Sequence, residues 1–155
     1  MNYWLMKSEP DVFGIEHLKA RPRRTAHWDG VRNYQARNML RDEMLAGDLA
    51  FFYHSSCAEP GIAGIVEVAR AGYPDFTALD RDNIHYDPKS SADKPIWYMV
   101  DVRFKRQFPR VITLQELKQY KQLRGMRLLQ RGTRLSIMPV TAKECDFIVK
   151  LAGGA

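Results

Sequence analysis

The sequence has few cysteines, no long apolar run and no basic N-terminal leader. Its two cysteines, Cys57 and Cys145, fit neither a disulfide framework nor the spacing of a metal finger, so we expect a reducing, cytoplasmic setting. No run approaches the ~18 consecutive apolar residues of a transmembrane helix. The first residues lack the basic and apolar regions of a secretory signal. We therefore expect neither a membrane span nor export.

The common catalytic signatures are also missing. There is no Walker A motif, no dinucleotide-binding glycine pattern and no Gly-x-Ser-x-Gly elbow. The four histidines (His17, His27, His54 and His85) form no helical i, i+4 pair, so we expect no zinc site and no cofactor. A nucleophile–base pair of Cys57 and His54 stays open, because that chemistry needs only two groups within reach. No orienting acid accompanies this pair.

What the sequence does contain is an ordinary globular composition with a basic excess. The 155 residues are 45% hydrophobic and 27% charged, which predicts a single domain over residues 1–155 with a real core. The net charge is +6. A positive excess favours polyanionic partners, since contacts to phosphate release counterions.

The hydrophobic patterns predict an α+β fold. Strand patterns occupy residues 2–6, 49–54, 62–68, 96–108 and 136–140, and helix patterns occupy 11–20, 33–44, 113–123 and 141–151. We expect about five or six strands and four helices, without regular βαβ alternation, and therefore a mixed or closed sheet flanked by helices. Residues 73–95 are polar and rich in turn residues, which predicts a surface excursion that is mobile or contacts a ligand.

Several single residues predict local geometry. Ser8 and Asn33 are suitable helix N-caps, and Thr113 and Thr141 each begin a capping box. Gly64 lies inside a strand pattern, where a glycine often marks a bulge or a barrel corner.

The densest group of recognition residues is the stretch from Trp28 to Asn38. It contains a Trp, a turn Gly, two Arg, two Asn, a Tyr and a Gln. A nucleobase is a flat heterocycle that needs an aromatic face to stack on and polar groups at its edge. Trp28 suits the face. The edge contacts are assigned to Lys7, Ser8, Asn38, His54 and Ser55. By residue type alone, however, Trp28 more often serves as a core aromatic whose N–H finds a carbonyl.

The segment Arg21-Pro22-Arg23-Arg24 carries three cations next to this stretch. One interpretation is a solvated basic loop, which is the commoner role of such a segment. The other is a rim that contacts phosphates, with Arg23 and Arg24 beside the binding residues.

These residues resemble the EVE domain family. The resemblance covers nearly the whole chain and several composition-rich strings in the same order. The strings are Tyr3-Trp4-Leu5-Met6-Lys7-Ser8-Glu9-Pro10, the stretch from Trp28 to Asn38, Gly47-Asp48, Phe51-Phe52-Tyr53-His54-Ser55, Pro60-Gly61-Ile62, Tyr73-Pro74-Asp75, Asp87-Pro88-Lys89-Ser90 and Arg134-Leu135-Ser136. Two positions depart from the family pattern: Ser56, where Asn is common, and Cys145, where Trp is common.

The resemblance implies a PUA-like mixed β-barrel of about five or six strands flanked by helices. It also implies kinship with YTH domains and a non-enzymatic role as a reader of modified bases, notably modified cytosine in DNA. In this sequence the implied nucleobase contacts are Lys7, Ser8, Trp28, Asn38, Tyr53, His54 and Ser55. Arg32 and Arg37 would lie at the mouth of the pocket, near phosphate.

Two other functions stay open at this stage. PUA-like domains generally serve RNA modification and translation, and nothing in the sequence separates a DNA partner from an RNA partner. A small enzyme acting on a nucleotide would use Glu9, Lys7 or His54. The leading expectation is a monomer that binds modified DNA and no membrane.

Overall fold

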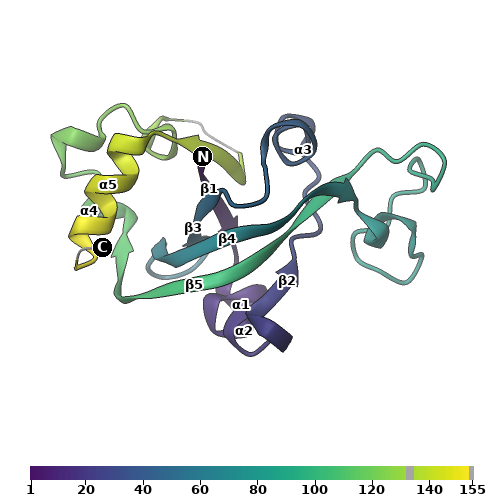
Figure 1. The fold of residues 1–155 in the computed structure, drawn as a ribbon, viewed down its shortest axis with the longest axis horizontal. Coiled ribbons are helices and arrows are strands. Elements are labelled where there is room, and N and C mark those ends of the chain that lie inside the picture. Colours follow the sequence, from purple (N-terminus) through teal and green to yellow (C-terminus); the bar gives the residue numbers. More distant parts are fainter. Residues whose placement is uncertain (132–134, 154–155) are drawn as a thin grey trace.

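The computed structural model describes residues 1–131 and 135–153, so Arg134 of the family resemblance lies outside the described part. One six-stranded sheet organises the chain, in the order β2-β5-β4-β3-β1-β6 (Figure 1). The strands are β1 (Tyr3–Ser8), β2 (Thr25–His27), β3 (Leu49–His54), β4 (Gly61–Pro74), β5 (Tyr98–Thr113) and β6 (Ile137–Val140).

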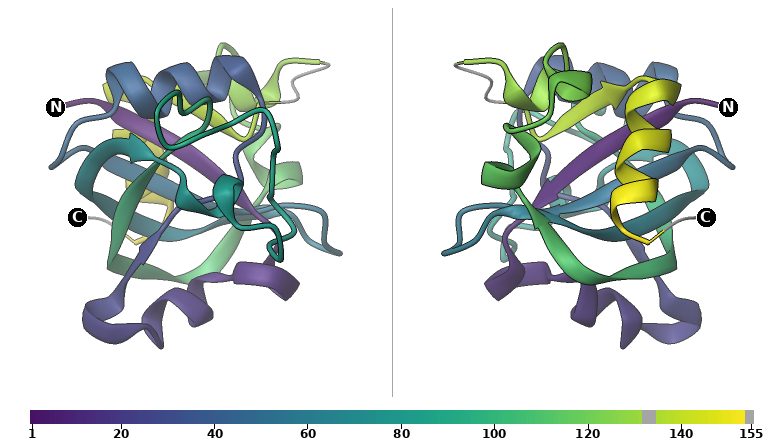
Figure 2. Two further views of the ribbon diagram at one scale, coloured as in Figure 1. Left: turned by 90° about the vertical axis from the view of Figure 1, so that its right-hand side faces the viewer. Right: turned by 90° about the vertical axis from the view of Figure 1, so that its left-hand side faces the viewer.

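The sheet is mixed, as the sequence predicts. β1 pairs with β3 in parallel, and the other neighbouring strands pair antiparallel. The sheet is strongly curved (Figure 2), but its hydrogen-bonded ladder has two edges, β2 and β6, and does not close within the described residues. Both edge strands are short, and Pro139 in β6 has no N–H to donate. The α+β PUA-like fold is confirmed, with an open barrel.

The helices expected over 33–44 and 141–151 form over nearly their whole ranges, whereas the other two are divided or shorter. The α-helices are α1 (Pro10–Phe13), α2 (Ile15–Lys19), α3 (Tyr34–Asn38), α4 (Leu114–Leu117) and α5 (Ala142–Leu151). The turns of 3-10 helix are η1 (Pro22–Arg24), η3 (Phe76–Leu79), η4 (Lys121–Leu123) and η5 (Arg127–Leu129), and the π-helical turn η2 (Met39–Glu43) continues α3.

Local hydrogen bonds explain where the helices begin and break. The predicted helix over residues 11–20 is two helices, because Gly14 is extended and its N–H donates to His17 Nδ1 at 2.8 Å. Ser8 does not cap it; its hydroxyl donates to Phe13 O instead. Asn33 caps α3 by accepting from Ala36 N at 2.9 Å, as predicted.

The core forms where the sheet is buried on both faces. Strand β3 is central, as its apolar residues predict, and Phe52 is fully buried. Strand β4 is irregular at Gly64, where the pairing with β5 shifts and a Cβ would collide with Arg106 O. The predicted irregularity at this glycine is therefore confirmed.

The excursion between β4 and β5 lies apart from the α4–α5 end of the molecule, at the opposite end of its longest axis (Figure 1). Apart from η3 it contains no helix or strand. It is nonetheless ordered by its own contacts, since Trp97 is buried and its indole N–H donates to Asp87 at 2.7 Å. Across residues 1–131 and 135–153, every helix is too short or too polar to cross a bilayer.

Candidate functional site

A cleft of about 590 Å³ opens where β1 ends. Ligand sites in proteins typically enclose ~300–1,000 Å³, so this volume accommodates a nucleobase. Its walls come from the end of β1, from α1, from the segment that follows β2 and from the tip of the excursion. The lining residues are Lys7, Ser8, Glu9, Val12, Phe13, Arg21, Ala26, His27, Trp28, Asp29, Gly30, Val31, Arg32, Ile84, His85 and Ser136.

Trp28 is both a core residue and a wall of the cleft. Its side chain is buried, and two aromatic rings hold it edge-on: Phe52 at 5.4 Å and Phe13 at 6.2 Å between centroids. Among the described residues, no fully buried side-chain nitrogen lacks a hydrogen-bond partner, and no acceptor contacts the Trp28 indole N–H. This N–H therefore faces accessible space, unlike that of a simple core tryptophan.

Lys7 and Ser8 form the floor of the cleft at the end of β1. The Lys7 backbone N–H donates to Ser136 O at 2.8 Å, and Ser136 also lines the cleft. The Lys7 ammonium lies 5.8 Å from the centre of the Tyr53 ring, and burial lowers the Lys7 pKa. The Ser8 hydroxyl donates to a backbone carbonyl, so its oxygen remains an acceptor.

Tyr53, His54 and Ser55 lie behind these residues and do not line the cleft. Tyr53 is 3% exposed, and burial raises its pKa to about 12. His54 Nε2 accepts from the Ile15 backbone N–H at 3.2 Å, and burial lowers the His54 pKa, which favours the neutral ring. His54 thus fixes α2 against the sheet.

The possible nucleophile–base pair does not form in this structure. Cys57 Sγ lies 3.9 Å from the carbonyl oxygen of His54 and makes its contact there, not with the imidazole ring.

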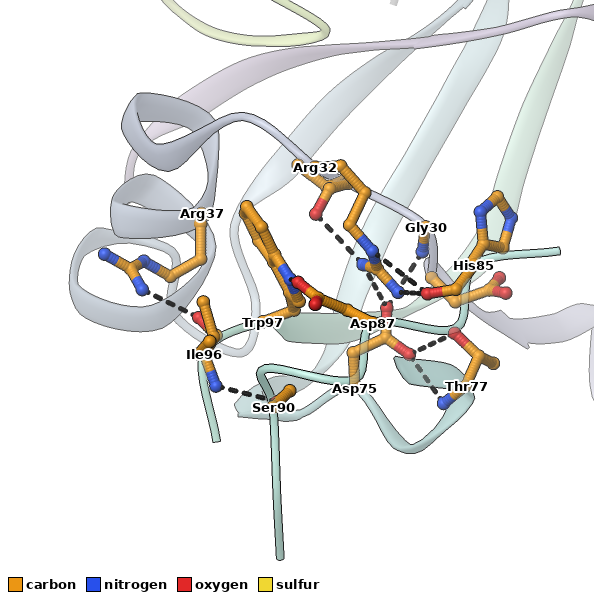
Figure 3. A network of polar contacts seen from close by, with 12 residues as sticks. Gly30, Arg32, Arg37, Asp75, Thr77, His85, Asp87, Ser90, Ile96 and Trp97 are labelled. Atoms are coloured by element: carbon orange, nitrogen blue, oxygen red, sulfur yellow. Dashed lines mark hydrogen bonds and ion pairs between the residues drawn. The ribbon is translucent and has the colours of Figure 1, made fainter. Parts of the chain in front are cut away.

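Asn38 and Arg37 also lie outside the lining of the cleft. Asn38 Oδ1 accepts from Arg37 Nε at 2.9 Å. Arg37 Nη1 then donates to Ile96 O at 2.7 Å, which connects α3 to the end of the excursion (Figure 3). Arg37 thus joins α3 to the end of the excursion, and Asn38 accepts a hydrogen bond from its guanidinium.

Arg32 lines the cleft, but its guanidinium is engaged within the protein. Nη1 pairs with Asp75 at 3.0 Å, while Nε and Nη2 donate to His85 O at 3.3 and 2.7 Å (Figure 3). The Asp75 carboxylate also accepts from Gly30 N and from Thr77. Burial alone would raise the Asp75 pKa, but these hydrogen bonds hold it below its ordinary value.

Arg23 and Arg24 are exposed in the turn before β2, and neither lines the cleft. Both have positive φ, at 56° and 51°. The Arg24 guanidinium lies over the Phe104 ring, 5.4 Å from its centre, so it faces β5. Arg21, from the same loop, does line the cleft and lies over Phe13.

The excursion contributes site residues that the sequence patterns do not single out. Ile84 is 92% exposed and lines the cleft with His85. Gly30 has φ +80°, and a Cβ there would lie 2.5 Å from His85 Nε2, so only glycine allows the excursion to pack this closely. The sequence contains the string Tyr73-Pro74-Asp75 of the family resemblance. Asp75 lies 45 positions from Gly30, however, so no local pattern predicts their contact.

Known proteins match this chain over nearly its whole length, including the strands of the sheet and the residues that line the cleft. The EVE domain profile matches residues 2–151. Thymocyte nuclear protein 1 of Mus musculus is 51% identical, over 97% of this chain and 73% of its own. A crystal structure of human THYN1 in complex with DNA containing 5-methylcytosine is 49% identical, with a TM-score of 0.93, and the match covers 100% of this chain and 99% of that chain.

A bacterial crystal structure is equally similar. This protein, from Pseudomonas putida, is 54% identical with a TM-score of 0.90, and the match covers 97% of this chain and 99% of that one. Such agreement in sequence and backbone extends over every element that builds the cleft. The chain belongs to the EVE domain family.

Proposed function

We propose that this protein binds a modified nucleobase, such as 5-methyl- or 5-hydroxymethylcytosine in DNA, and catalyses no reaction on it. The observation that carries this proposal is the human THYN1 structure, which holds DNA containing 5-methylcytosine and matches this chain along its entire length. The cleft at the end of β1 is the site to which we assign the base.

The chemistry of the cleft supports this assignment. Stacking of a base on an aromatic side chain contributes ~1–3 kcal/mol, and Trp28 is held rigidly for that purpose by two edge-on rings. The Trp28 N–H and the Lys7 ammonium supply donors, and the Ser8 oxygen supplies an acceptor. A base in a duplex must first be extruded, at a cost of a few kcal/mol, which phosphate contacts elsewhere on the protein offset.

We divide the expected site residues into two roles, according to whether they line the cleft. We assign direct base contacts to Lys7, Ser8 and Trp28. Tyr53, His54 and Ser55 support them from behind: the Ser55 N–H donates to Ser8 O at 2.9 Å, and Tyr53 lies beside the Lys7 ammonium. Asn38 and Arg37 act through the position of α3.

A binding array tests the proposal. Oligonucleotides of one sequence, as DNA and as RNA, carry either cytosine or a modified cytosine, and affinity is measured by fluorescence anisotropy. We expect the tightest binding to modified DNA. A preference for modified RNA would favour the RNA-linked function, and equal affinity for modified and unmodified strands would refute base reading.

A substitution at Trp28 tests the stacking role. Trp28→Leu keeps an apolar side chain in the core but removes the aromatic face, so affinity for the modified strand should fall about tenfold or more. Trp4→Phe is the control, because Trp4 is equally buried but does not line the cleft. The control should lower stability and leave affinity unchanged. Parental affinity in a folded Trp28→Leu variant would show that the base stacks elsewhere.

A further inference from the structure

The positive charge of this protein is concentrated in one part of the chain. Residues 102–143 contain eleven of the 24 lysines and arginines but only one of the 18 acidic residues, Glu116, for a net charge of +10. The remaining residues therefore sum to −4, since the whole chain carries +6. The basic excess is thus a property of this segment and not of the surface as a whole.

The side of the cleft formed by the excursion does not attract phosphate. Residues 75–95 hold five aspartates and three cations. The arginines next to them are engaged: Arg32 by Asp75 and His85 O, and Arg37 by Ile96 O and Asn38. A nucleic-acid backbone that approached over the excursion would meet net negative charge, because its five aspartates outnumber its three cations.

A groove at the α4–α5 end of the molecule has the opposite character. Its volume is about 280 Å³, and it is lined by Lys118, Gln119, Tyr120, Lys121, Arg124 and Leu129. Its three cations are exposed, and within the described residues no carboxylate lies within 4.0 Å of any of them. Figure 1 places α4, which the groove adjoins, at the end of the longest axis opposite the excursion.

The single acid of the segment does not weaken the groove. Arg110 holds Glu116 through two contacts, at 2.5 and 3.1 Å, and the Tyr120 hydroxyl donates to the same carboxylate at 3.0 Å. The paired arginine lowers the Glu116 pKa and balances its charge. The pairing leaves the three cations of the groove exposed, with no carboxylate of the described residues within 4.0 Å.

The groove and the cleft have lining residues that are near one another in the sequence. Leu129 lines the groove, and Ser136, seven positions later, lines the cleft and accepts the Lys7 backbone hydrogen bond. We propose that Lys118, Lys121 and Arg124 bind the phosphate backbone of the nucleic acid whose modified base enters the cleft. This inference rests on the proposed function and replaces the cleft-rim arginines as the main source of phosphate contacts.

The test compares two variants of equal charge. Lys118→Gln, Lys121→Gln and Arg124→Gln are combined in a groove variant. Arg81→Gln, Lys89→Gln and Lys94→Gln are combined in a control variant, which removes three exposed cations of the excursion instead. Affinity for a modified duplex is measured between ~50 and ~200 mM salt, because each duplex phosphate contact contributes about 0.9 to the slope of log affinity against log salt. Circular dichroism and thermal melting verify the fold of both variants.

We expect the groove variant to lose about 2.7 from the slope, for three contacts at about 0.9 each, and the control variant to lose less than about 0.9. The ratio of affinities for modified and unmodified strands should stay at the parental value, since the cleft is intact. Equal slopes for the groove variant and the parent, or equal losses for both variants, would overturn the groove assignment. A parent that binds no nucleic acid, or binds it without preference for the modified base, would refute the proposed function instead.

Discussion

Arg32 at the cleft and the three cations of the groove are held in opposite ways. At the cleft, the Arg32 guanidinium is bound to Asp75 and His85 O, and it also lies over the Trp97 ring. In the groove, Lys118, Lys121 and Arg124 are exposed and have no carboxylate within 4.0 Å among the described residues. Arg32 therefore stabilises the wall of the cleft through contacts within the protein, whereas the cations of the groove remain available to a partner.

The two regions therefore suit different roles: the cleft would select the base, and the groove would attract the nucleic-acid backbone. Base contacts specify a sequence or a modification, while phosphate contacts position the nucleic acid and supply salt-dependent affinity. A wall held by a partly buried ion pair keeps a fixed shape, which suits the recognition of one base. Exposed lysines on a groove adapt to a backbone of any sequence. Substitutions in the two regions should accordingly have different consequences.

The largest loss of stability is expected when Asp75, the carboxylate that holds the wall of the cleft, is removed. Asp75→Ala removes the partner of Arg32 and the acceptor for the Gly30 and Thr77 N–H groups. Breaking a buried pair by removing one member costs ~3–5 kcal/mol, and we expect a loss near ~3 because Arg32 retains contact with solvent. Urea denaturation measures the change. Asp82→Ala, an exposed aspartate of the same excursion, should stay within about 0.5 kcal/mol of the parent.

A second substitution of the same residue, Asp75→Asn, tests a pH dependence of stability. The folded-state pKa of Asp75 is lowered, so its stabilising contribution is complete above the ordinary Asp value of about 3.9 and is lost as pH falls through the lower folded value. The stability difference between the parent and Asp75→Asn should therefore shrink as the pH is lowered below about 4. A difference that stays constant down to pH ~2 would show that the contribution of Asp75 does not depend on its charge.

A smaller loss of stability is expected when Gly30, in the turn that lines the cleft, is substituted. Gly30→Ala introduces a Cβ 2.5 Å from His85 Nε2 at a residue with φ +80°. Gly47→Ala is a matched control, since Gly47 has φ +95° and nothing within 4 Å of its Cβ position. The left-handed conformation costs roughly 1–2 kcal/mol at both positions. The contact with His85 should add about 1 kcal/mol at Gly30 alone, the low end of the cost of overpacking, because the atoms it meets belong to a side-chain ring that can shift.

Removal of the neighbouring ring separates the two contributions at Gly30. In the double variant Gly30→Ala with His85→Ala, the added cost should disappear and the cost of the conformation should remain. If Gly30→Ala and Gly47→Ala destabilise the protein equally, the excursion does not press against the turn in solution.

Much of the fold was predictable from local patterns. The apolar residues of β3 identify a central strand, and Asn33 and Thr141 begin helices where their side chains can cap them. The sequence patterns do not predict β2, because a strand of three residues has too short a pattern and its pairing partner in β5 is more than seventy positions away. The helix over 11–20 was wrong as one element, because a single hydrogen bond from Gly14 to His17 divides it.

The candidate site was predictable in part. Lys7, Ser8, Trp28 and Arg32 do line one cleft, because the end of β1 and the turn after β2 meet there. The sequence shows that Arg32 and Lys118 are both cations, but it does not show which of them has a carboxylate partner within reach. That distinction depends on Asp75, 43 positions from Arg32, and on the packing of an irregular excursion.

The smallest effect concerns the one acid within the basic segment. Glu116→Gln frees Arg110 beside the groove and raises the charge by one, so the salt slope for duplex binding should steepen by up to about 0.9, with stability changed by less than ~1 kcal/mol. Glu67→Gln is a close control: Glu67 and Glu116 are each 22% exposed, and their arginine partners, Arg103 and Arg110, are 50% and 53% exposed. Both substitutions change the net charge equally, but only Glu116 adjoins the groove. Steepening confined to Glu116→Gln would assign the phosphate contacts to that location, whereas equal steepening would mean that net charge alone attracts the nucleic acid.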